Sequence, residues 1–266
     1  MLPGLLANIS PHVDEIVVID GGPDGPSTDN TLEILESADK VVCQSGTYKM
    51  GDGVGWDMSR QRNDAINLAT GDIYVFVSAD MLFVGLEHLR EAAEQGDSAI
   101  LFCNTFEFWE DTSKLRLYTA DCDVLTLPAP ILEPISVASR FHPFWEENGT
   151  LNLEGAEHGD RGLLVGTLKF HMGWIRPFAQ QVAKHKRNVK QGRWGEVGGA
   201  ILAGGERKLE QWAIQQVMSY EGIPSIAYSG ELPAEMELLD GMKYNNGIDA
   251  ALKDYEERYG ISPFRG

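Results

Sequence analysis

The sequence is poor in cysteine and has no long apolar run. Its 3 cysteines, Cys43, Cys103 and Cys122, show no CxxC spacing. This pattern favours buried, reduced thiols over a disulfide framework or a zinc site. No stretch approaches the roughly 20 apolar residues of a transmembrane helix, and the first residues lack the pattern of a signal peptide. We therefore expect no membrane span and a cytoplasmic location.

Basic residues are also scarce, because 22 Lys and Arg stand against 40 Asp and Glu, which gives a formal net charge of -18. Such a charge repels phosphate backbones and disfavours nucleic acid as a partner. The basic stretch is residues 173–195, GWIRPFAQQVAKHKRNVKQGRWG, which contains no acid. Its ordinary interpretation is a helix with a solvated basic face.

The first part of the chain alternates short runs rich in β-branched residues with helical segments, which predicts a largely parallel, doubly wound sheet. From about residue 98, strand-like runs follow one another and predict an antiparallel or mixed extension, and helices close the chain. The length and the 43% hydrophobic content indicate one compact domain. Strands are predicted at 15–20, 40–44, 72–78, 98–109, 114–120 and 134–141, and helices at 1–15, 27–39, 59–70, 85–95, 176–190, 206–221 and 247–260. Ser27 or Thr28 is the expected N-cap of the helix 27–39.

Polar residues stand where predicted strands end. Asp20 closes the first strand, Asp80 follows the third, and His171 follows the run TLKF. Ligands of open α/β sheets bind at the carboxyl ends of strands, and Mg²⁺ or Mn²⁺ prefers oxygen ligands and tolerates imidazole. Asp80, His171 and a diphosphate would therefore make a consistent metal site. The ordinary alternatives are a turn aspartate and a hydrogen-bonded core histidine.

Three segments share a joint pattern. DEIVVIDGGPDGPSTDNTLEIL (14–35), SRQRNDAINLATGDIYVFVSAD (59–80) and KFHMGWIRP (169–177) follow in this order. They resemble the signature segments of GT-A fold, family 2-like glycosyltransferases: a strand ending in an acid before Asp-Gly-Gly-Ser-Thr-Asp-x-Thr, an Arg-Asn helix leading to a DxD motif, and a His-x-Gly-Trp segment. The resemblance covers residues 1–95 well and 135–190 more loosely.

The resemblance implies a single GT-A, Rossmann-like α/β domain over residues 1–266. Residues 1–95 would bind the nucleotide-sugar, and residues 96–266, ending in helices, would bind the acceptor. The implied enzyme is a hexosyltransferase-type glycosyltransferase that uses Mn²⁺ or Mg²⁺ and moves a sugar from a nucleotide-diphosphate donor, expected to be a UDP-sugar, to a hydroxyl acceptor. Inversion fits the resemblance best, and retention stays open. A glycan, a small molecule or a modified DNA base remain open as the acceptor.

The resemblance also implies roles for single residues. Asp20 would contact the base or ribose of the donor, and Arg62 would lie near its sugar or diphosphate. Asp80 would bind the metal, and His171 would be a further ligand. The base that inversion requires is expected in the loop 153–162, LEGAEHGDRG, with Glu157 as first choice and Asp160 as second. A solvated acidic loop is the ordinary interpretation of that segment.

The sequence departs from the family pattern at three places. Ser78 replaces the first carboxylate of DxD and would be a weaker partner for the ribose or for metal-bound water. An insertion, PDGP (23–26), offers Asp24 as a substitute contact. The family's first strand has no counterpart, so either the chain is shortened or the sheet lacks that strand.

Other functions stay open beside this one. One is a catalytically degenerate GT-A domain that only binds nucleotide. Another is a phage-type DNA glycosyltransferase acting on a hydroxymethylated base, with residues 173–195 against the DNA, which the net charge opposes. A nucleotidyltransferase ranks last, because the expected Gly-rich loop with a basic residue is missing near the N-terminus.

Overall fold

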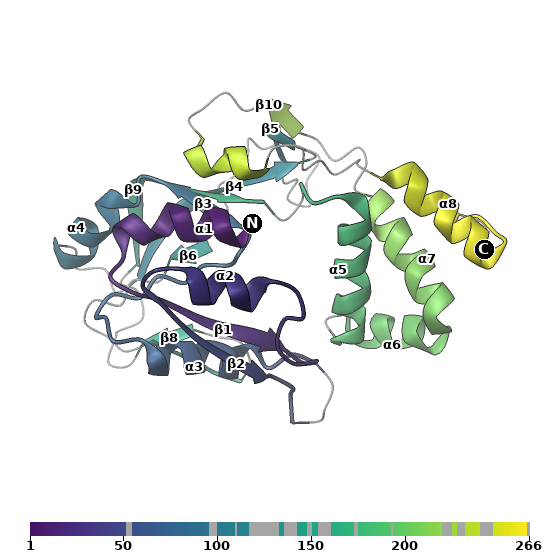
Figure 1. Ribbon diagram of the computed structural model, residues 1–266, viewed down its shortest axis with the longest axis horizontal. Helices are drawn as coiled ribbons and strands as arrows, with labels where there is room; N and C mark the ends of the chain where they lie inside the picture. The colour runs from purple at the N-terminus through teal and green to yellow at the C-terminus, as the bar shows by residue number, and fades with distance from the viewer. Residues whose placement is uncertain are drawn as a thin grey trace.

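The computed structural model consists of a sheet-bearing part with helices α1–α4 and a helical part with α5–α8 (Figure 1). The N-terminus lies between the two parts, and the C-terminus lies at the far end of the helical part. The structure describes residues 1–51, 55–95, 100–109, 111–116, 133–135, 143–147, 151–153, 161–172, 175–192, 194–219, 225–227, 232–239 and 247–264.

The first two strands pair in parallel. β1 (Ile16–Gly22) and β2 (Val41–Thr47) are connected through α2 (Thr31–Ser37), and Asp20 lies opposite Ser45 near their carboxyl ends. A parallel pair needs a crossover connection, which α2 supplies. The predicted strands 15–20 and 40–44 are therefore confirmed. The predicted helix is confirmed as well, but it begins later than residue 27.

Helix α3 (Met58–Leu68) lies against β1 and satisfies part of its free edge. Its cap is Asp57, whose side chain accepts a hydrogen bond from the backbone of Arg60. Gln61 Nε2 donates to the carbonyl oxygens of Ile19 at 2.8 Å and Gly21 at 3.0 Å. Because an unpaired carbonyl is costly away from water, this side chain stands in for a strand partner.

The predicted strand 72–78 is not a strand in the structure, which corrects that expectation. Ile73, Val75 and Val77 do pack against the core at every second position, as in an extended chain. Among the described strands, however, β1 pairs with β2 alone, so it offers this run no ladder. β-branched residues favour an extended backbone, whereas a strand also needs a neighbour in register. The strand that forms is β3 (Met81–Val84), which starts directly after Asp80.

The larger sheet is mixed, as the predicted extension required. Its strand order is β10-β5-β4-β9-β3, with β6 on β4; β4 and β9 run parallel, and the other pairs run antiparallel. β7 and β8 form a separate antiparallel pair. The strands are β4 (Ile100–Trp109), β5 (Asp111–Arg116), β6 (Glu133–Ile135), β7 (Pro143–Trp145), β8 (Leu151–Leu153), β9 (Arg161–His171) and β10 (Ser225–Ala227).

The main core lies between this sheet and helices α1 (Leu2–Ile9) and α4 (Glu87–Gln95). Asn8, buried on α1, completes the edge of β3 that β9 does not cover. Its Nδ2 donates to the Phe83 carbonyl at 3.0 Å, and its Oδ1 accepts from the Phe83 N–H at 2.7 Å. One side chain thereby replaces a strand and fixes β3, the element that follows Asp80. Two 3-10 turns, Ser10–His12 and Ala234–Leu239, complete this part.

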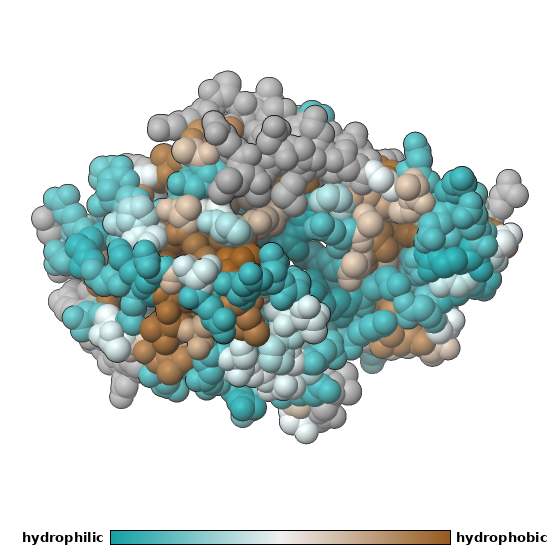
Figure 2. Space-filling view, in the orientation of Figure 1, coloured by the Kyte–Doolittle hydropathy of each residue, from teal (hydrophilic) through white to brown (hydrophobic). Residues whose placement is uncertain are grey.

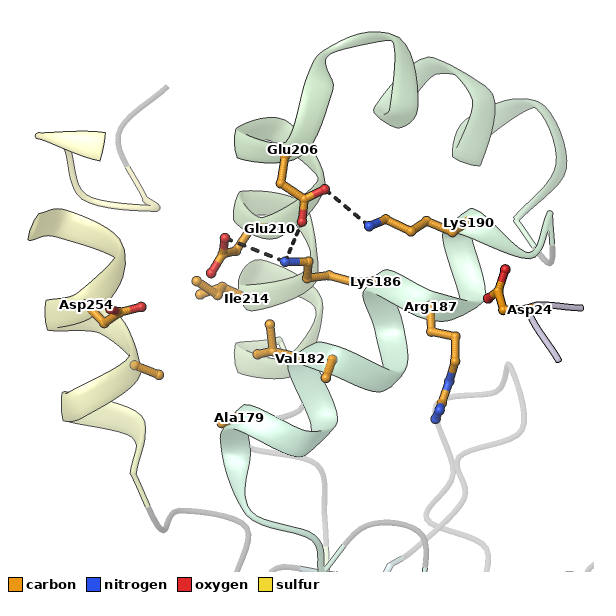
Figure 3. A pocket seen from close by; sticks show the side chains of 12 residues that line it. Asp24, Ala179, Val182, Lys186, Arg187, Lys190, Glu206, Glu210, Ile214 and Asp254 are labelled. Carbon is orange, nitrogen blue, oxygen red and sulfur yellow. Dashed lines mark ion pairs between the residues drawn. The ribbon is translucent and has the colours of Figure 1, made fainter. Parts of the chain in front are cut away.

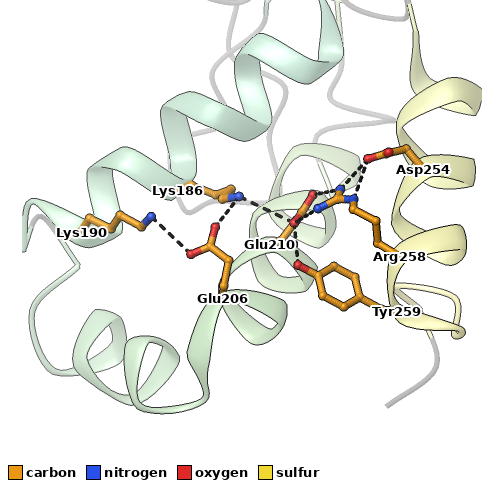
Figure 4. A network of polar contacts seen from close by, with 7 residues as sticks. All are labelled: Lys186, Lys190, Glu206, Glu210, Asp254, Arg258 and Tyr259. Carbon is orange, nitrogen blue, oxygen red and sulfur yellow. Dashed lines mark hydrogen bonds and ion pairs between the residues drawn. The ribbon is translucent and has the colours of Figure 1, made fainter.

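The helical part packs α5 (Phe178–Lys190), α7 (Gly205–Met218) and α8 (Ile248–Tyr259) around Phe178 and Tyr255, with α6 (Gly195–Ala203) between α5 and α7. Acids of α7 join the three long helices (Figure 4). Glu206 pairs with Lys186 and Lys190 of α5 at 2.7 and 3.3 Å, and Glu210 pairs with Arg258 of α8. Three helices were expected here, and α6 was not.

The mixed α/β class is confirmed, whereas one doubly wound sheet stays a prediction: the described strands form three separate sheets. Within the ranges given above, no helix is long and apolar enough to cross a membrane. Cys43 is a free, partly buried thiol, in line with expectation. The side chains of the other two cysteines lie outside the described part.

Candidate functional site

The antiparallel pairing of β3 with β9 brings Asp80 and His171 together. Met81 lies opposite His171 in the register, and the Met172 N–H donates to the Asp80 carbonyl oxygen at 2.7 Å. His171 Nε2 then lies 3.5 Å from Asp80 Oδ2, and the two side chains are 21% and 13% exposed. The two predicted metal ligands therefore share one partly enclosed place.

A third residue, Arg176, completes this cluster. Its Nη2 donates to Asp80 Oδ2 at 2.8 Å, and its side chain is 22% exposed. Arg176 stands just before Pro177, the cap of α5, so the start of that helix lies at the site. From the sequence, Arg176 was assigned only to the basic stretch 173–195. Its position, five residues after His171 in a segment without acids, is the sequence feature that could have indicated a place at the site.

The surrounding cations keep Asp80 ionised. Burial alone would raise its pKa, but the hydrogen bond and charge of His171, followed by the charges of Arg176 and Lys184, hold the pKa of Asp80 well below its usual range. The α-amino group of Met1 feels the same surroundings: burial, and then Arg176, lower its pKa, while Asp80 opposes this. Asp80 is therefore an ionised carboxylate at neutral pH.

The pair suits a hard divalent cation that also binds a phosphate ligand. Mg²⁺ holds its ligands at about 2.1 Å in octahedral geometry, which puts adjacent ligand atoms about 3 Å apart. The 3.5 Å between Asp80 Oδ2 and His171 Nε2 is close to this spacing. In the described part of the chain no group of three His, Cys, Asp or Glu side chains could hold a metal. The residues present therefore fit an ion whose other ligands are water and phosphate oxygens.

Ser78 lies in the turn that precedes β3. The Met81 N–H donates to the Ser78 carbonyl at 3.1 Å, and the Ser78 side chain is exposed. Asp80 thus projects from a turn, and the serine stays at the solvent side of that turn.

Asp20 is held by the loop that follows β1. Asp20 is buried, and Ser27 donates to it twice, from its N–H to Oδ2 at 2.9 Å and from its hydroxyl to Oδ1 at 2.5 Å. The expectation that Ser27 or Thr28 caps α2 is therefore wrong. The N-cap of α2 is Asn30. The adjacent Gly21 has φ +146°, and a Cβ there would lie 2.1 Å from the Gly46 carbonyl. Only glycine fits this crossing of β1 and β2.

The insertion forms a tight turn with Asp24 at its tip. Gly22 and Gly25 exchange backbone hydrogen bonds at 2.9 and 3.2 Å, so Pro23 and Asp24 make the tip. Asp24 is exposed and lies beside the end of α5 that carries Arg187 and Lys190 (Figure 3). It is thus placed against the helical part, and a contact with the donor stays a prediction.

Asp24 lines a cavity of about 520 Å³ between α5, α7 and α8. The cavity has an apolar floor that includes Val182 and Ile214, and charged walls of both signs that include Lys186 and Glu210. Asp80, His171 and Arg176 do not line it. The surface between the sheet-bearing part and α5 is recessed and hydrophilic (Figure 2).

The other predicted residues are placed less fully. Arg62 lies half-buried on α3, and its place near the donor stays a prediction. Glu157 and Asp160 fall outside the described residues, so nothing tests their proposed role as base.

Comparison with known protein families matches more than half of the chain. The sequence profile described as Glycosyl transferase family 2 matches residues 4–148. This region contains Asp20, Asp24, Arg62, Ser78 and Asp80, whereas His171 and Arg176 lie beyond it. No curated protein matches the chain.

Proposed function

The chain belongs to glycosyl transferase family 2 and is a glycosyltransferase enzyme, and on this premise we propose that it depends on a divalent metal and uses a UDP-sugar as donor. The sugar passes to a hydroxyl group of the acceptor with inversion at the anomeric carbon. The observation that supports this most directly is the contact of Asp80 with His171 at 3.5 Å, beside the cation Arg176.

Acidic and basic side chains have different roles in the proposed site. Asp80 and His171 would hold Mn²⁺ or Mg²⁺, and the bound ion would supply positive charge to neutralise the diphosphate leaving group. Lys184 and Arg176 offset the remaining negative charge in a partly enclosed site, where such interactions are strong. Asp20, oriented by Ser27, accepts hydrogen bonds from the base or ribose.

The acceptor side is assigned to residues 96–266. We propose Glu157, with Asp160 as second choice, as the base that takes the proton of the acceptor hydroxyl. A small acceptor is favoured over DNA, because Lys186 and Lys190 of the basic helix already pair with Glu206. Cations engaged in this way contribute less to phosphate binding. Transfer that falls steeply with added salt would instead favour DNA.

The test is calorimetric titration of UDP into the protein, first with Mn²⁺ and then with a chelator. We expect binding that requires the metal, and a loss of at least about tenfold in affinity for Asp80→Ala and for His171→Ala. Asp72→Ala and His88→Ala, at exposed positions, are the matched controls and should bind like the parent. Equal binding with and without Mn²⁺, or parent-like binding by both site variants, would contradict the metal-site assignment.

A further inference from the structure

The guanidinium of Arg176 is only partly used. Nη2 donates to Asp80, but the buried Nε has no hydrogen-bond acceptor among the residues that the structure describes. Nε and Nη2 present parallel N–H groups on one edge of a guanidinium, the edge that binds carboxylate or phosphate with two hydrogen bonds. A buried N–H without an acceptor is costly. The edge is therefore suited to a ligand that offers two oxygens.

One oxygen of Asp80, Oδ2, is in contact with both Arg176 and His171. Asp80 Oδ2 lies 2.8 Å from Arg176 Nη2 and 3.5 Å from His171 Nε2. A divalent ion held by Asp80 and His171 would take a position beside this oxygen, close to the guanidinium. Because two cations at such a distance repel each other strongly in a partly enclosed site, ion and guanidinium compete for Asp80.

We propose that Arg176 neutralises Asp80 in the metal-free protein and moves to the diphosphate of the donor when a divalent ion takes its place on the carboxylate. This rests on the proposed function, since it presupposes a metal and a nucleotide diphosphate at the site. Arg176 is then both a competitor of the metal and a ligand of the donor. Metal and nucleotide favour each other's binding, because the diphosphate accepts the guanidinium that the metal displaces.

The two roles predict opposite effects of one substitution. Arg176→Gln removes the competing charge, so the affinity for Mn²⁺ alone should rise by several-fold. The affinity for UDP at saturating Mn²⁺ should fall by about tenfold or more, as expected for losing hydrogen bonds from a charged donor. If the substitution damaged the fold, the affinities for Mn²⁺ and for UDP would both fall. The expected signature is thus a gain for the ion and a loss for the nucleotide.

The experiment measures Mn²⁺ binding without nucleotide, and UDP binding at saturating Mn²⁺, for the parent, Arg176→Gln and Arg176→Lys. Lysine keeps the charge and loses the two-pronged edge, so Mn²⁺ binding should stay near the parent and UDP binding should be intermediate. Arg207→Gln, at an exposed position of α7, is the control for removal of a cation and should match the parent in both titrations.

The outcomes separate this proposal from the proposed function. If the parent binds UDP with Mn²⁺ and Arg176→Gln binds UDP equally well, or binds Mn²⁺ more weakly, the role of Arg176 is wrong while the function stands. If the parent fails to bind UDP under both conditions, the proposed function fails and this proposal fails with it.

Discussion

Ser27 holds both carboxylate oxygens of Asp20, with its N–H on Oδ2 at 2.9 Å and its hydroxyl on Oδ1 at 2.5 Å. Four residues, Pro23 to Pro26, lie between the end of β1 and Ser27, and they include the turn at Pro23 and Asp24. The serine thereby closes the loop after β1 and orients the carboxylate that is expected to meet the nucleoside.

Replacing Ser27 by Ala should weaken UDP binding by a few-fold and lower the free energy of unfolding by about 1 kcal/mol. The hydroxyl bond is lost, and the carboxylate of Asp20 is then oriented by the backbone bond alone. Calorimetry with Mn²⁺ and denaturant unfolding measure the two effects. Ser37→Ala, which removes an exposed hydroxyl bonded to Ile34, is the control. Parent-like UDP affinity in Ser27→Ala would show that Asp20 does not depend on the serine.

Replacing Gln61 by Leu should lower the free energy of unfolding by about 1–3 kcal/mol, because two carbonyls of β1 lose their donor. Trp56, whose Nε1 donates to Gln61 at 2.9 Å, loses its acceptor as well. The exposed Gln180 of α5 provides a control, Gln180→Leu, with an expected change near zero. Equal stability of the two variants would mean that water satisfies this edge of β1.

Replacing Glu210 by Ala should lower the free energy of unfolding by about 2–4 kcal/mol. Glu210 is 10% exposed and accepts from Arg258 of α8 and from Tyr259. Burial alone would raise the pKa of Glu210, but the hydrogen bond from Arg258 and then the charge of Lys186 lower it, so the folded protein holds an ionised carboxylate. Its removal leaves both cations without this partner. Glu257→Ala, which breaks an exposed pair with Lys253, should change stability by less than about 0.5 kcal/mol. Similar losses in both would contradict a special role for Glu210.

His185 should make the helical part less stable in acid. Burial, and then the charge of Lys184, lower the pKa of His185 from 6.5 to about 4. Between about pH 6.5 and pH 4, His185 is therefore protonated in the unfolded chain and neutral in the folded protein. The stabilisation is complete above pH 6.5 and is lost as the pH falls through this window, by at most about 3 kcal/mol.

His185→Phe removes that titration and keeps a ring beside Trp212, whose centroid lies 6.2 Å from the imidazole. Denaturant unfolding at several pH values, followed by tryptophan fluorescence, should give a shallower slope between pH 4 and 6.5 for the variant than for the parent. Identical slopes would show that His185 takes up its proton as readily in the folded protein as in the unfolded chain.

The sequence predicted the pairing of Asp80 with His171 but not the strand that makes it. The run 73–77 has the residues of a strand, whereas the ladder forms one turn later, at Met81–Val84, because β9 offers its register there. Local preference can be read from side chains, while a partner strand far along the chain cannot. The same holds for Arg176, whose contact with Asp80 spans 96 residues.

Helix α6 and the capping of Asp20 were missed for other reasons. GEVGGAILA contains three glycines, which argue against a helix by intrinsic propensity, and packing of Ile201 with Val189 and Leu209 decides otherwise. Ser27 was expected to cap α2, because serine before a helix usually does so. In the structure the Ser27 hydroxyl instead donates to the buried Asp20 carboxylate. This hydrogen bond has a charged acceptor and is therefore stronger than a neutral hydrogen bond to a helix N–H.

The register between β3 and β9 also has a consequence for synthesis on the ribosome. Met81 must wait for His171 before its strand can pair, and translation proceeds at about 5–20 residues per second. For several seconds the nascent chain carries Asp80 without its imidazole and Arg176 partners, and β3 with one edge open. Asn8, which covers the opposite edge of β3 in the folded protein, has already been synthesised by then. The cluster of Asp80, His171 and Arg176 is thus completed late, when the chain leading into α5 has emerged.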